Sequence, residues 1–456
     1  MRRSILPIVV LFLFGVVAAP ATAAEDLQSL VDAASPGDVL TLPSGTYEGN
    51  VVISKPLEIH GDGWPVIDGG GEGNVITVEA PDVVITGLVI ANTGTSLEQE
   101  NAGLSVNAPR VTIVGNRFES VLFGVFLRRA VDSYVANNII GAMDVEVARR
   151  GDGIRLWESS RTVIEGNVVD GGRDSVLWFS DDLTLRGNRV TNGRYGIHFM
   201  YSDGALVEGN HLSSNSVGGF LMYSRDLVLK DNLISDNHGP SGYGIGLKDM
   251  DGVEATGNYL IGNRVGVYLD NSPATPGLKH HFTDNVFAYN EIGTLFLPSV
   301  KGNVLVGNAF VENGEQVGVQ GKGEFHGSNV WTVGDSGNYW SDFAGYDADD
   351  DGVGDIPYQL ADLFSSLTDK HPELHFFDTT PASKAIDLAG RMFPSFRPRP
   401  KVTDSAPLVE MPRIPVPVTT DQSASTLETA AASTGMVAMA GALWLIARAP
   451  LRRRTR

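Results

Sequence analysis

Short runs of alternating apolar and polar residues recur along most of the chain, and the pattern is clearest in residues 195–251. In this stretch residues 200–202 (MYS) return 22 residues later as residues 222–224. Each pass contains a short apolar run, a polar turn, a second apolar run and a Gly-Asn or Asp-Asn pair. Self-similarity at this period is typical of a solenoid in which each repeat forms one coil.

The repeat extends well beyond this stretch, because an asparagine marks the same position in nine passes separated by 21 to 29 residues: Asn116, Asn138, Asn167, Asn188, Asn210, Asn232, Asn258, Asn285 and Asn308. Three short strands and three tight turns fill about 22 residues, so the pattern predicts an all-β fold, a right-handed parallel β-helix. We expect each asparagine to adopt the left-handed conformation at a corner and to bond to the next one.

The longer steps between asparagines predict loops at residues 143–150, 238–243 and 272–281. Leucine-rich repeats share the period, but their leucine consensus is absent from this sequence. A β-propeller would need a longer period and Trp-Asp signatures. A parallel β-helix therefore remains the best interpretation of the repeat.

The two ends of the chain differ from the repeats. Residues 1–24 combine Arg2 and Arg3, an apolar run and an Ala-x-Ala motif, which predicts a cleaved secretory signal peptide. Residues 25–393 form the predicted β-helix with terminal caps, beginning with a capping helix at 26–34 that covers otherwise unpaired strand edges. An uncleaved N-terminal anchor is the alternative, and it too would place the body outside the cytoplasm.

Residues 394–428 are rich in Pro, Ser and Thr and predict an extended linker. Residues 429–447 are apolar and uncharged, and the basic segment 448–456 follows them. This order predicts a C-terminal transmembrane anchor with a cytoplasmic basic tail. A helix on the membrane surface or an unstructured tail would also fit this composition.

The net charge of −20 argues against nucleic acid as a partner, because phosphate backbones require a basic surface. The chain has no cysteine, so it forms no disulfide and offers no thiolate to a metal. Metal binding would therefore depend on histidine, methionine and carboxylate side chains.

Aligning the coils by their asparagines places equivalent residues in columns along the β-helix. Period-2 alternation sends the uniformly apolar column inward: Leu127, Leu156, Leu177, Phe199, Leu221 and Leu247. The flanking columns then face outward: Phe126, Arg155, Val176, His198, Phe220 and Gly246 on one side, and Arg128, Trp157, Trp178, Met200, Met222 and Lys248 on the other. Coils about 4.8 Å apart would bring these side chains together in an exposed apolar stripe.

An apolar stripe of this size predicts a docking surface, for which we expect Trp157, Trp178, Phe220, Arg155 and Lys248 to contact a protein partner. A loop or the Pro-rich segment covering the stripe would instead make it an ordinary satellite core.

Three residues of the stripe could bind a metal ion. His198 and Met200 lie on one strand face, and Met222 is one coil away from Met200. An imidazole with two thioethers is a soft site that suits Cu(I) rather than Zn²⁺ or Ca²⁺. Methionine on an apolar face more often serves packing, so both interpretations stay open.

The acidic stretch 347–355 begins like a calcium-binding loop. Asp347, Asp349, Asp351 and Asp355 occupy loop positions 1, 3, 5 and 9, and Gly352 occupies position 6. Position 12, which should supply a bidentate glutamate, is Tyr358. The pattern predicts a structural Ca²⁺, with a bare acidic turn as the alternative.

Catalysis is not expected of this chain. Acid–base chemistry requires paired carboxylates or a similar cluster at one point, and no column stacks carboxylates on a strand face. Most aspartates lie in turns, where aspartate is common.

Several segments resemble the NosD family of periplasmic β-helix proteins, which are required to mature the copper enzyme nitrous oxide reductase in denitrification. They are GDGIRLWESS (151–160), RYGIHFMYSDGALVEGN (194–210), GGFLMYSRDLVLKDN (218–232), GPSGYGIGLKD (239–249) and GNYWSDFAGYDADDDGVGDIPY (337–358). The similarity covers roughly residues 25–410.

The resemblance implies a non-catalytic, extracytoplasmic docking arm of an ABC transporter complex, whose partner ATPase and membrane subunit use ATP to support assembly of copper–sulfide centres. A copper chaperone lipoprotein would donate Cu(I), and nitrous oxide reductase would receive it. The chain has no Walker loop of its own. The fold alone leaves a second function open, that of a cell-envelope protein that binds or modifies carbohydrate.

Overall fold

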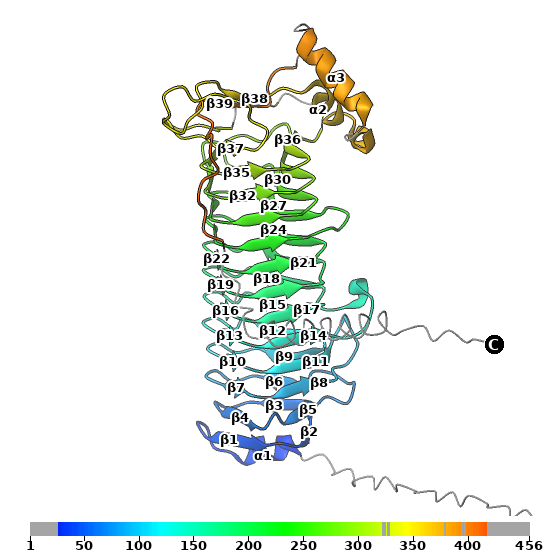
Figure 1. Cartoon of the computed structure of the whole chain (residues 1–456). Coiled ribbons are helices and arrows are strands. Elements are labelled where there is room, and N and C mark those ends of the chain that lie inside the picture. The colour runs from blue at the N-terminus through cyan, green and yellow to red at the C-terminus, as the bar shows by residue number, and fades with distance from the viewer. Residues whose placement is uncertain are drawn as a thin grey trace, which may run out of the picture.

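A computed structural model describes residues 26–416, except 322–324, 326–328, 378–379, 394 and 396–397. The described chain is a long column of stacked coils (Figure 1). A short helix closes one end, and two helices with a small two-stranded sheet lie at the other. The predicted signal peptide (1–24), the anchor (429–447) and the basic tail lie outside the described residues.

Three parallel sheets run the length of the column, and each coil contributes one strand to each sheet. Sheet 1 contains β1 (Val39–Pro43), β4 (Glu58–Asp62), β7 (Val84–Thr86), β10 (Thr112–Val114), β13 (Tyr134–Ala136), β16 (Val163–Glu165), β19 (Thr184–Arg186), β22 (Leu206–Glu208), β25 (Val228–Lys230), β28 (Glu254–Thr256), β31 (His280–Thr283) and β34 (Asn303–Val306). Sheet 2 contains β2 (Thr46–Glu48), β5 (Val66–Asp68), β8 (Val89–Ala91), β11 (Arg117–Val121), β14 (Ile139–Ala142), β17 (Val168–Asp170), β20 (Arg189–Thr191), β23 (His211–Ser213), β26 (Leu233–Ser235), β29 (Tyr259–Ile261), β32 (Val286–Ala288), β35 (Ala309–Val311) and β37 (Tyr339–Trp340). Sheet 3 contains β3 (Val51–Ile53), β6 (Ile76–Val78), β9 (Ala102–Val106), β12 (Phe123–Arg128), β15 (Ile154–Trp157), β18 (Asp174–Trp178), β21 (Tyr195–Met200), β24 (Val217–Met222), β27 (Tyr243–Lys248), β30 (Val265–Asp270), β33 (Ile292–Phe296) and β36 (Glu315–Val319). The sequence prediction of a parallel β-helix is therefore confirmed.

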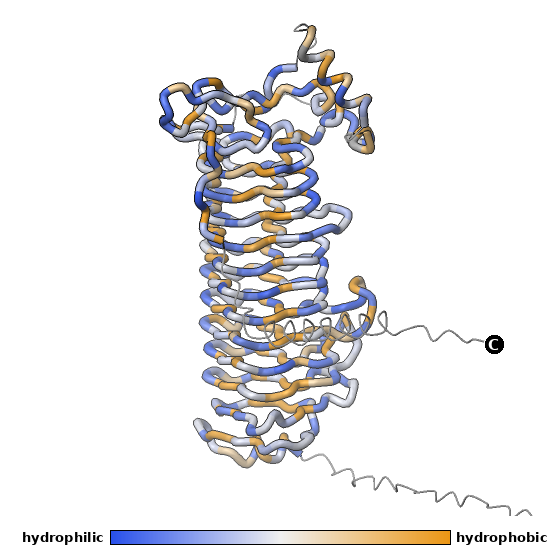
Figure 2. Tube along the Cα trace, viewed as in Figure 1, coloured by the Kyte–Doolittle hydropathy of each residue, from blue (hydrophilic) through white to orange (hydrophobic). Residues whose placement is uncertain are grey.

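The hydrophobic core fills the interior of the column. The predicted inward column is buried throughout, since Leu127, Leu156, Phe199, Leu221 and Leu247 are all fully enclosed. Figure 2 shows the corresponding alternation, in which short apolar segments are separated by polar turns in every coil. Each coil buries its apolar side chains only against its neighbours, so stability accumulates along the stack.

The asparagines form the predicted ladder. The side-chain amide of Asn188 donates to Asn210 Oδ1 at 2.9 Å, and that of Asn210 donates to Asn232 Oδ1 at 3.0 Å. The expected left-handed conformation of the ladder asparagines is wrong. The preceding residue adopts it instead, as at Gly187 (φ 61°) and Asp231 (φ 51°), because the chain turns immediately before the amide enters the core.

The predicted capping helix is present as α1 (Leu27–Ala33). Asp26 caps it by accepting a hydrogen bond from the Ser29 backbone N–H, and Leu27 and Val31 are buried. The helix packs against β3 and so covers the apolar end of the first coil.

The other end is closed by α2 (Leu363–Thr368), α3 (Pro381–Met392), a 3₁₀ helix (Pro372–Phe377) and the antiparallel pair β38 (Tyr358–Leu360) and β39 (Val402–Asp404). The segment after β39 runs back along the column, where the Ile414 carbonyl accepts a hydrogen bond of 2.6 Å from the Tyr259 hydroxyl (Figure 1). The described part of the predicted linker is therefore in contact with the β-helix.

The insertion between β14 and β15 contains a short 3₁₀ helix (Val147–Arg149). Arg150 anchors this loop by donating to the Gly171 carbonyl at 2.7 Å. Within the described residues, no helix is long and apolar enough to cross a bilayer.

Candidate functional site

The outward face of sheet 3 carries the residues that the sequence singled out. The register pairs Trp157 with Trp178, Trp178 with Met200, and Met200 with Met222. Lys248 continues this column on β27. The aromatic and methionine side chains are half-buried rather than fully exposed, because neighbours one coil away cover part of each. The face is therefore a continuous, partly packed surface.

Phe126 and Val176, which the sequence analysis expected to be exposed on this face, are buried, with 3% and 1% of their surface exposed. His198 is also buried, with 6% of its surface exposed. The rings of Trp178 and Tyr195 meet it nearly at right angles, with centroids 5.4 and 5.0 Å away. Neither imidazole nitrogen has a hydrogen-bond partner within the part of the chain that the structure describes. Buried polar atoms without partners are rare in proteins, so this pair of nitrogens suits a ligand such as a metal ion.

A β-bulge places His198 next to Asp174. Between β18 and β21, Asp174 pairs with Tyr195 and Val176 with His198, so β21 contains one extra residue. This extra residue agrees with the spacing of the ladder asparagines, since the coil ending at Asn188 is 21 residues long and the next is 22. Bulges re-aim side chains, and this one brings His198 Nδ1 to 3.7 Å from Asp174 Oδ2.

Asp174 is buried and tightly held. Arg194 donates to it through Nε at 3.0 Å and through Nη2, and the Tyr195 backbone N–H donates at 3.2 Å. Burial pushes the pKa of Asp174 up, but interactions with His198 and Arg194 outweigh burial and leave the pKa below its ordinary value. Asp174 is thus an ionised acceptor beside the imidazole.

A second buried carboxylate, Asp152, lies one coil away. It forms ion pairs with Arg173 at 3.3 Å and with Arg155 at 3.5 Å. Burial raises the pKa of Asp152 to about 6, and the charge of Asp174 adds to this rise while the two arginines oppose it. Arg155 also pairs with Glu100 at 3.3 Å.

The sequence analysis missed these two carboxylates as a pair. It judged that no column stacked carboxylates, yet Asp152 and Asp174 lie near the start of consecutive sheet 3 strands, both fully enclosed. The available signal was an aspartate shortly before the apolar run in two successive repeats. Turn aspartates are so common that this signal did not stand out.

A ladder of exposed aromatic rings flanks the methionines, and the sequence analysis missed it too. Phe179, Tyr201 and Tyr223 follow Trp178, Met200 and Met222 directly in the chain. Their rings stack with centroids 5.3 and 5.1 Å apart, and Phe179 and Tyr201 are 40% and 48% exposed.

All three residues of this aromatic ladder have a left-handed backbone, with φ of 52° to 53°. That conformation is strained for a bulky side chain, so packing of the coil alone does not account for three successive aromatic residues there.

The remaining docking candidates have partners of their own. Arg155 lies over the Phe126 ring, with Cζ 5.0 Å from its centroid. Phe220 contacts Tyr195 with ring centroids 5.7 Å apart. Lys248 bonds to Asp270 at 2.9 Å, and this bond raises the pKa of the lysine. Arg155 and Lys248 therefore lie on either side of the apolar part of the face, and each forms an ion pair within the chain.

The calcium candidates lie near the C-terminal end, in a loop apart from sheet 3. Carboxylate oxygens of Asp347, Asp349 and Asp351 lie within 4.8 Å of one another. The charge of Asp351 is the main cause that raises the pKa of Asp349.

The other positions of this loop differ in what they offer. Asp355 accepts a hydrogen bond from the Ala348 backbone N–H at 2.6 Å. Tyr358, at loop position 12, is buried in β38 and stacks on Trp340, so it supplies no ligand.

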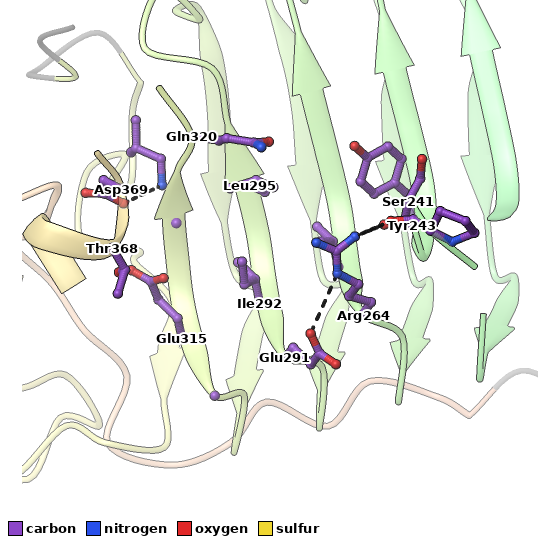
Figure 3. Close-up of a pocket in the computed structure, with 15 residues that line it drawn as sticks. Ser241, Tyr243, Arg264, Glu291, Ile292, Leu295, Glu315, Gln320, Thr368 and Asp369 are labelled. Atoms are coloured by element: carbon purple, nitrogen blue, oxygen red, sulfur yellow. Dashed lines mark hydrogen bonds and ion pairs between the residues drawn. The ribbon is translucent and has the colours of Figure 1, made fainter. Parts of the chain in front are cut away.

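Figure 3 shows a groove on the sheet 3 side with a volume of about 650 Å³. It crosses β30, β33 and β36 between residues 240–243 and α2. Arg264 pairs with Glu291 at 3.8 Å, and Lys401 pairs with Glu315 and Asp369 at 2.8 and 2.7 Å. The charged side chains of the groove therefore form ion pairs within the chain, whereas the imidazole nitrogens of His198 have no hydrogen-bond partner among the described residues.

The architecture defines a right-handed parallel β-helix protein, with aromatic and methionine side chains grouped on the outward face of one sheet. Two solved structures share the fold, both A-modules of mannuronan C-5 epimerases from Azotobacter vinelandii. AlgE6 has a TM-score of 0.54 at 16% identity, covering 67% of this chain and 94% of that module. AlgE4 has a TM-score of 0.53 at 15% identity, covering 69% and 97%. At such identities the likeness concerns the fold alone.

Sequence comparison identifies the family. The family model described as "Periplasmic copper-binding protein (NosD)" matches residues 137–345, which include the whole His198 and methionine region. A "Probable ABC transporter binding protein NosD" from Pseudomonas aeruginosa is 31% identical, over 89% of this chain and 95% of the relative. One of the same name from Stutzerimonas stutzeri is 29% identical over 81% and 86%. The chain belongs to the NosD family.

Proposed function

We propose that this chain is the extracytoplasmic copper-handling and docking component of an ABC transporter complex that matures the copper–sulfide centres of nitrous oxide reductase. The observation that carries the proposal is the face of β21 and β24 that carries His198, Met200 and Met222. The imidazole nitrogens lack partners, and the two methionines are in register on adjacent strands. One imidazole and two thioethers form a soft donor set suited to Cu(I).

The chain itself would be non-catalytic, with ATP hydrolysed by a partner subunit. Cu(I) is a cargo that is bound transiently, received from a copper chaperone lipoprotein and passed to the apo-reductase. Thioether ligands suit such a transfer because they bind Cu(I) without a charge that must be neutralised on release. The family description and the names of the relatives support this role.

Copper binding is tested by anaerobic competition of the full chain, in detergent, with a chromophoric Cu(I) chelator. We expect Met200→Leu/Met222→Leu and His198→Gln to raise the Kd for Cu(I) at least about tenfold, or about 1.4 kcal/mol. Met411→Leu is the matched control, because Met411 is 43% exposed and lies outside the three sheets. Wild-type affinity in both site variants would overturn the copper site.

The same face would serve for docking, through Trp157, Trp178, Phe220, Arg155, Lys248 and the aromatic ladder. Binding of the full chain to purified apo-reductase is the direct measurement. Large aromatic anchors dominate such interfaces, so we expect Trp157→Ala and Phe220→Ala each to weaken binding at least about tenfold. Trp64→Ala is the control, since Trp64 is 42% exposed and lies between β4 and β5, away from sheet 3. Equal losses in the control would exclude sheet 3 as the interface.

The ends of the chain complete the proposal. Residues 1–24 would be removed on export, and residues 429–447 would anchor the protein in the cytoplasmic membrane. N-terminal sequencing of the mature protein tests the first statement. Alkaline carbonate extraction of membranes tests the second, since an anchored protein stays with the lipid and a chain ending at residue 416 is released.

A structural Ca²⁺ in the loop formed by Asp347, Asp349, Asp351 and Asp355 is also proposed. Three carboxylates within 4.8 Å repel one another unless a cation lies between them. Backbone N–H bonds to Asp347 from Asp350 and Gly352, and to Asp351 from Val353, already order the loop around the site.

A further inference from the structure

We propose that Asp174 is a positioning residue, which holds the imidazole of His198 with its proton on Nδ1 and leaves Nε2 as the nitrogen that binds Cu(I). The inference rests on the proposed copper-handling function. It adds a defined donor atom and a carboxylate that the sequence analysis did not select. Metal-binding histidines commonly need such a partner, because the group that accepts from one ring nitrogen decides which nitrogen is free for the metal.

The geometry favours Nδ1 as the protonated nitrogen. Nδ1 of His198 lies 3.7 Å from Asp174 Oδ2, and both side chains are almost completely enclosed. An ionised carboxylate has no proton to donate, so it stabilises the tautomer in which the facing nitrogen carries the hydrogen. Shortening this distance by about 0.5 Å would bring the two atoms within hydrogen-bond distance.

Asp174 is itself held in place, which a positioning role requires. Arg194 Nε donates to Oδ1 at 3.0 Å, a second Arg194 nitrogen donates to Oδ2, and the Tyr195 backbone N–H donates to Oδ1 at 3.2 Å. These bonds keep the carboxylate from rotating. The bulge in β21 then sets His198 against the fixed carboxylate.

The surroundings of the ring restrict its other nitrogen to a soft ligand. The Trp178 and Tyr195 rings contact the imidazole at 88° and 78°, which locks its orientation without supplying a polar partner for Nε2. Met200 lies two residues further along the same face, and Met222 is in register with Met200. Two thioethers on the same sheet face as one imidazole form a donor set that favours Cu(I) over a hard cation.

Nitrogen NMR of the full chain, labelled with ¹⁵N-histidine, reports the tautomer directly. His198→Gln assigns the resonances by their loss. In the wild type we expect a protonated Nδ1 and an unprotonated Nε2, with Cu(I) shifting the Nε2 resonance. Asp174→Asn should increase the Nε2–H tautomer and raise the Kd for Cu(I) about 10- to 100-fold.

Asp152→Asn is the matched control, because Asp152 is an equally buried carboxylate one coil away that pairs with arginines rather than with His198. It should leave both the tautomer and the Kd at wild-type values. Thermal unfolding of both variants verifies that they fold. An Nε2–H tautomer in the wild type, or an Asp174→Asn variant with unchanged tautomer and Kd, would overturn the role of Asp174. A wild-type Kd in His198→Gln would overturn the copper site itself. The failure of the copper site is thereby distinguished from the failure of the positioning role of Asp174.

Discussion

The carboxylate of Asp404 accepts a hydrogen bond of 2.7 Å from the backbone N–H of Asn338, although the two residues are 66 positions apart in the chain. Asp404 also accepts from Trp340 Nε1 at 2.9 Å and from the Thr332 hydroxyl at 2.7 Å. It thereby ends the asparagine ladder, since Asn308 donates to Asn338 Oδ1 and Asp404 takes the place of a further asparagine. A residue from the predicted linker closes the last coil.

Replacing Asp404 by alanine should therefore open the C-terminal end of the column. Three buried donors would lose their acceptor, at a cost of about 1–3 kcal/mol each. Coils of a solenoid contact only their neighbours, so hydrogen exchange should increase in residues 331–340 and 402–414 and stay unchanged in the first coils. Mass-spectrometric hydrogen exchange measures this, with the exposed turn residue Asp335→Ala as control. Uniform loss of protection along the whole column would contradict the prediction.

The buried carboxylate of Asp152 should make stability depend on pH. Its folded-state pKa of about 6 lies above the ordinary value of 3.8, so ionisation is disfavoured in the folded state. The folded protein therefore loses stability as the pH rises from about 4 to about 6, and the loss persists above that range. Asp152→Asn removes this pH dependence, so its free energy of unfolding relative to wild type should increase by about 2 kcal/mol between pH 4 and pH 8.

Calorimetric melting temperatures at several pH values test whether Asp152→Asn becomes more stable relative to wild type as the pH rises. Asp182→Asn is the control, because Asp182 is an exposed turn residue whose φ of 55° asparagine also adopts readily. The stability of Asp182→Asn relative to wild type should show no comparable increase as the pH rises. A melting temperature of Asp152→Asn that falls relative to wild type at neutral pH would show that its ion pairs with Arg155 and Arg173 outweigh burial.

The aromatic ladder should matter more for binding than for folding. Tyr201→Asn removes two ring stacks worth about 0.5–1.5 kcal/mol each, and it relieves a left-handed conformation that costs tyrosine about 1–2 kcal/mol. We expect stability to change by only about 1 kcal/mol, while affinity for the apo-reductase falls at least about tenfold.

Tyr289→Asn controls for the backbone conformation, since Tyr289 has φ of 55° and is 64% exposed at a corner of sheet 2. It should leave the affinity unchanged. A large loss of stability in Tyr201→Asn with unchanged affinity would identify the ladder as a structural element.

Calcium should stabilise the C-terminal end if it binds the loop that begins at Asp347. A ligand at 100 times its Kd stabilises the folded state by about 2.7 kcal/mol, which raises the melting temperature relative to a sample with chelator. Asp349→Asn should abolish the rise, because Asp349 is one of the three clustered carboxylates, and Asp335→Asn should retain it. Equal melting temperatures with calcium and with chelator in the wild type would exclude the site.

Much of the site was predictable because a parallel β-helix converts sequence spacing into spatial neighbours. Met200 and Met222 are 22 residues apart and lie in register on adjacent strands, as the repeat predicts. The apolar column ending in Leu247 points inward for the same reason, since alternation along a strand sends successive side chains to opposite faces. Neither conclusion required any contact beyond one coil.

The sequence by itself thus determined the parallel β-helix, the inward apolar column and the register of Met200 with Met222, because all of these follow from a regular period. The tertiary structure decided the contacts that arise from an irregular coil or between residues far apart in the chain. The one-residue bulge in β21 sets His198 beside Asp174, and the packed coils bury both side chains. Asp404 reaches Asn338 only after the chain has built α2 and α3 and returned. The return of Asp404 depends on a long excursion of the chain that the repeat spacing does not encode. The change from a 21-residue to a 22-residue coil is visible in the spacing, but it does not indicate which side chains the bulge brings together.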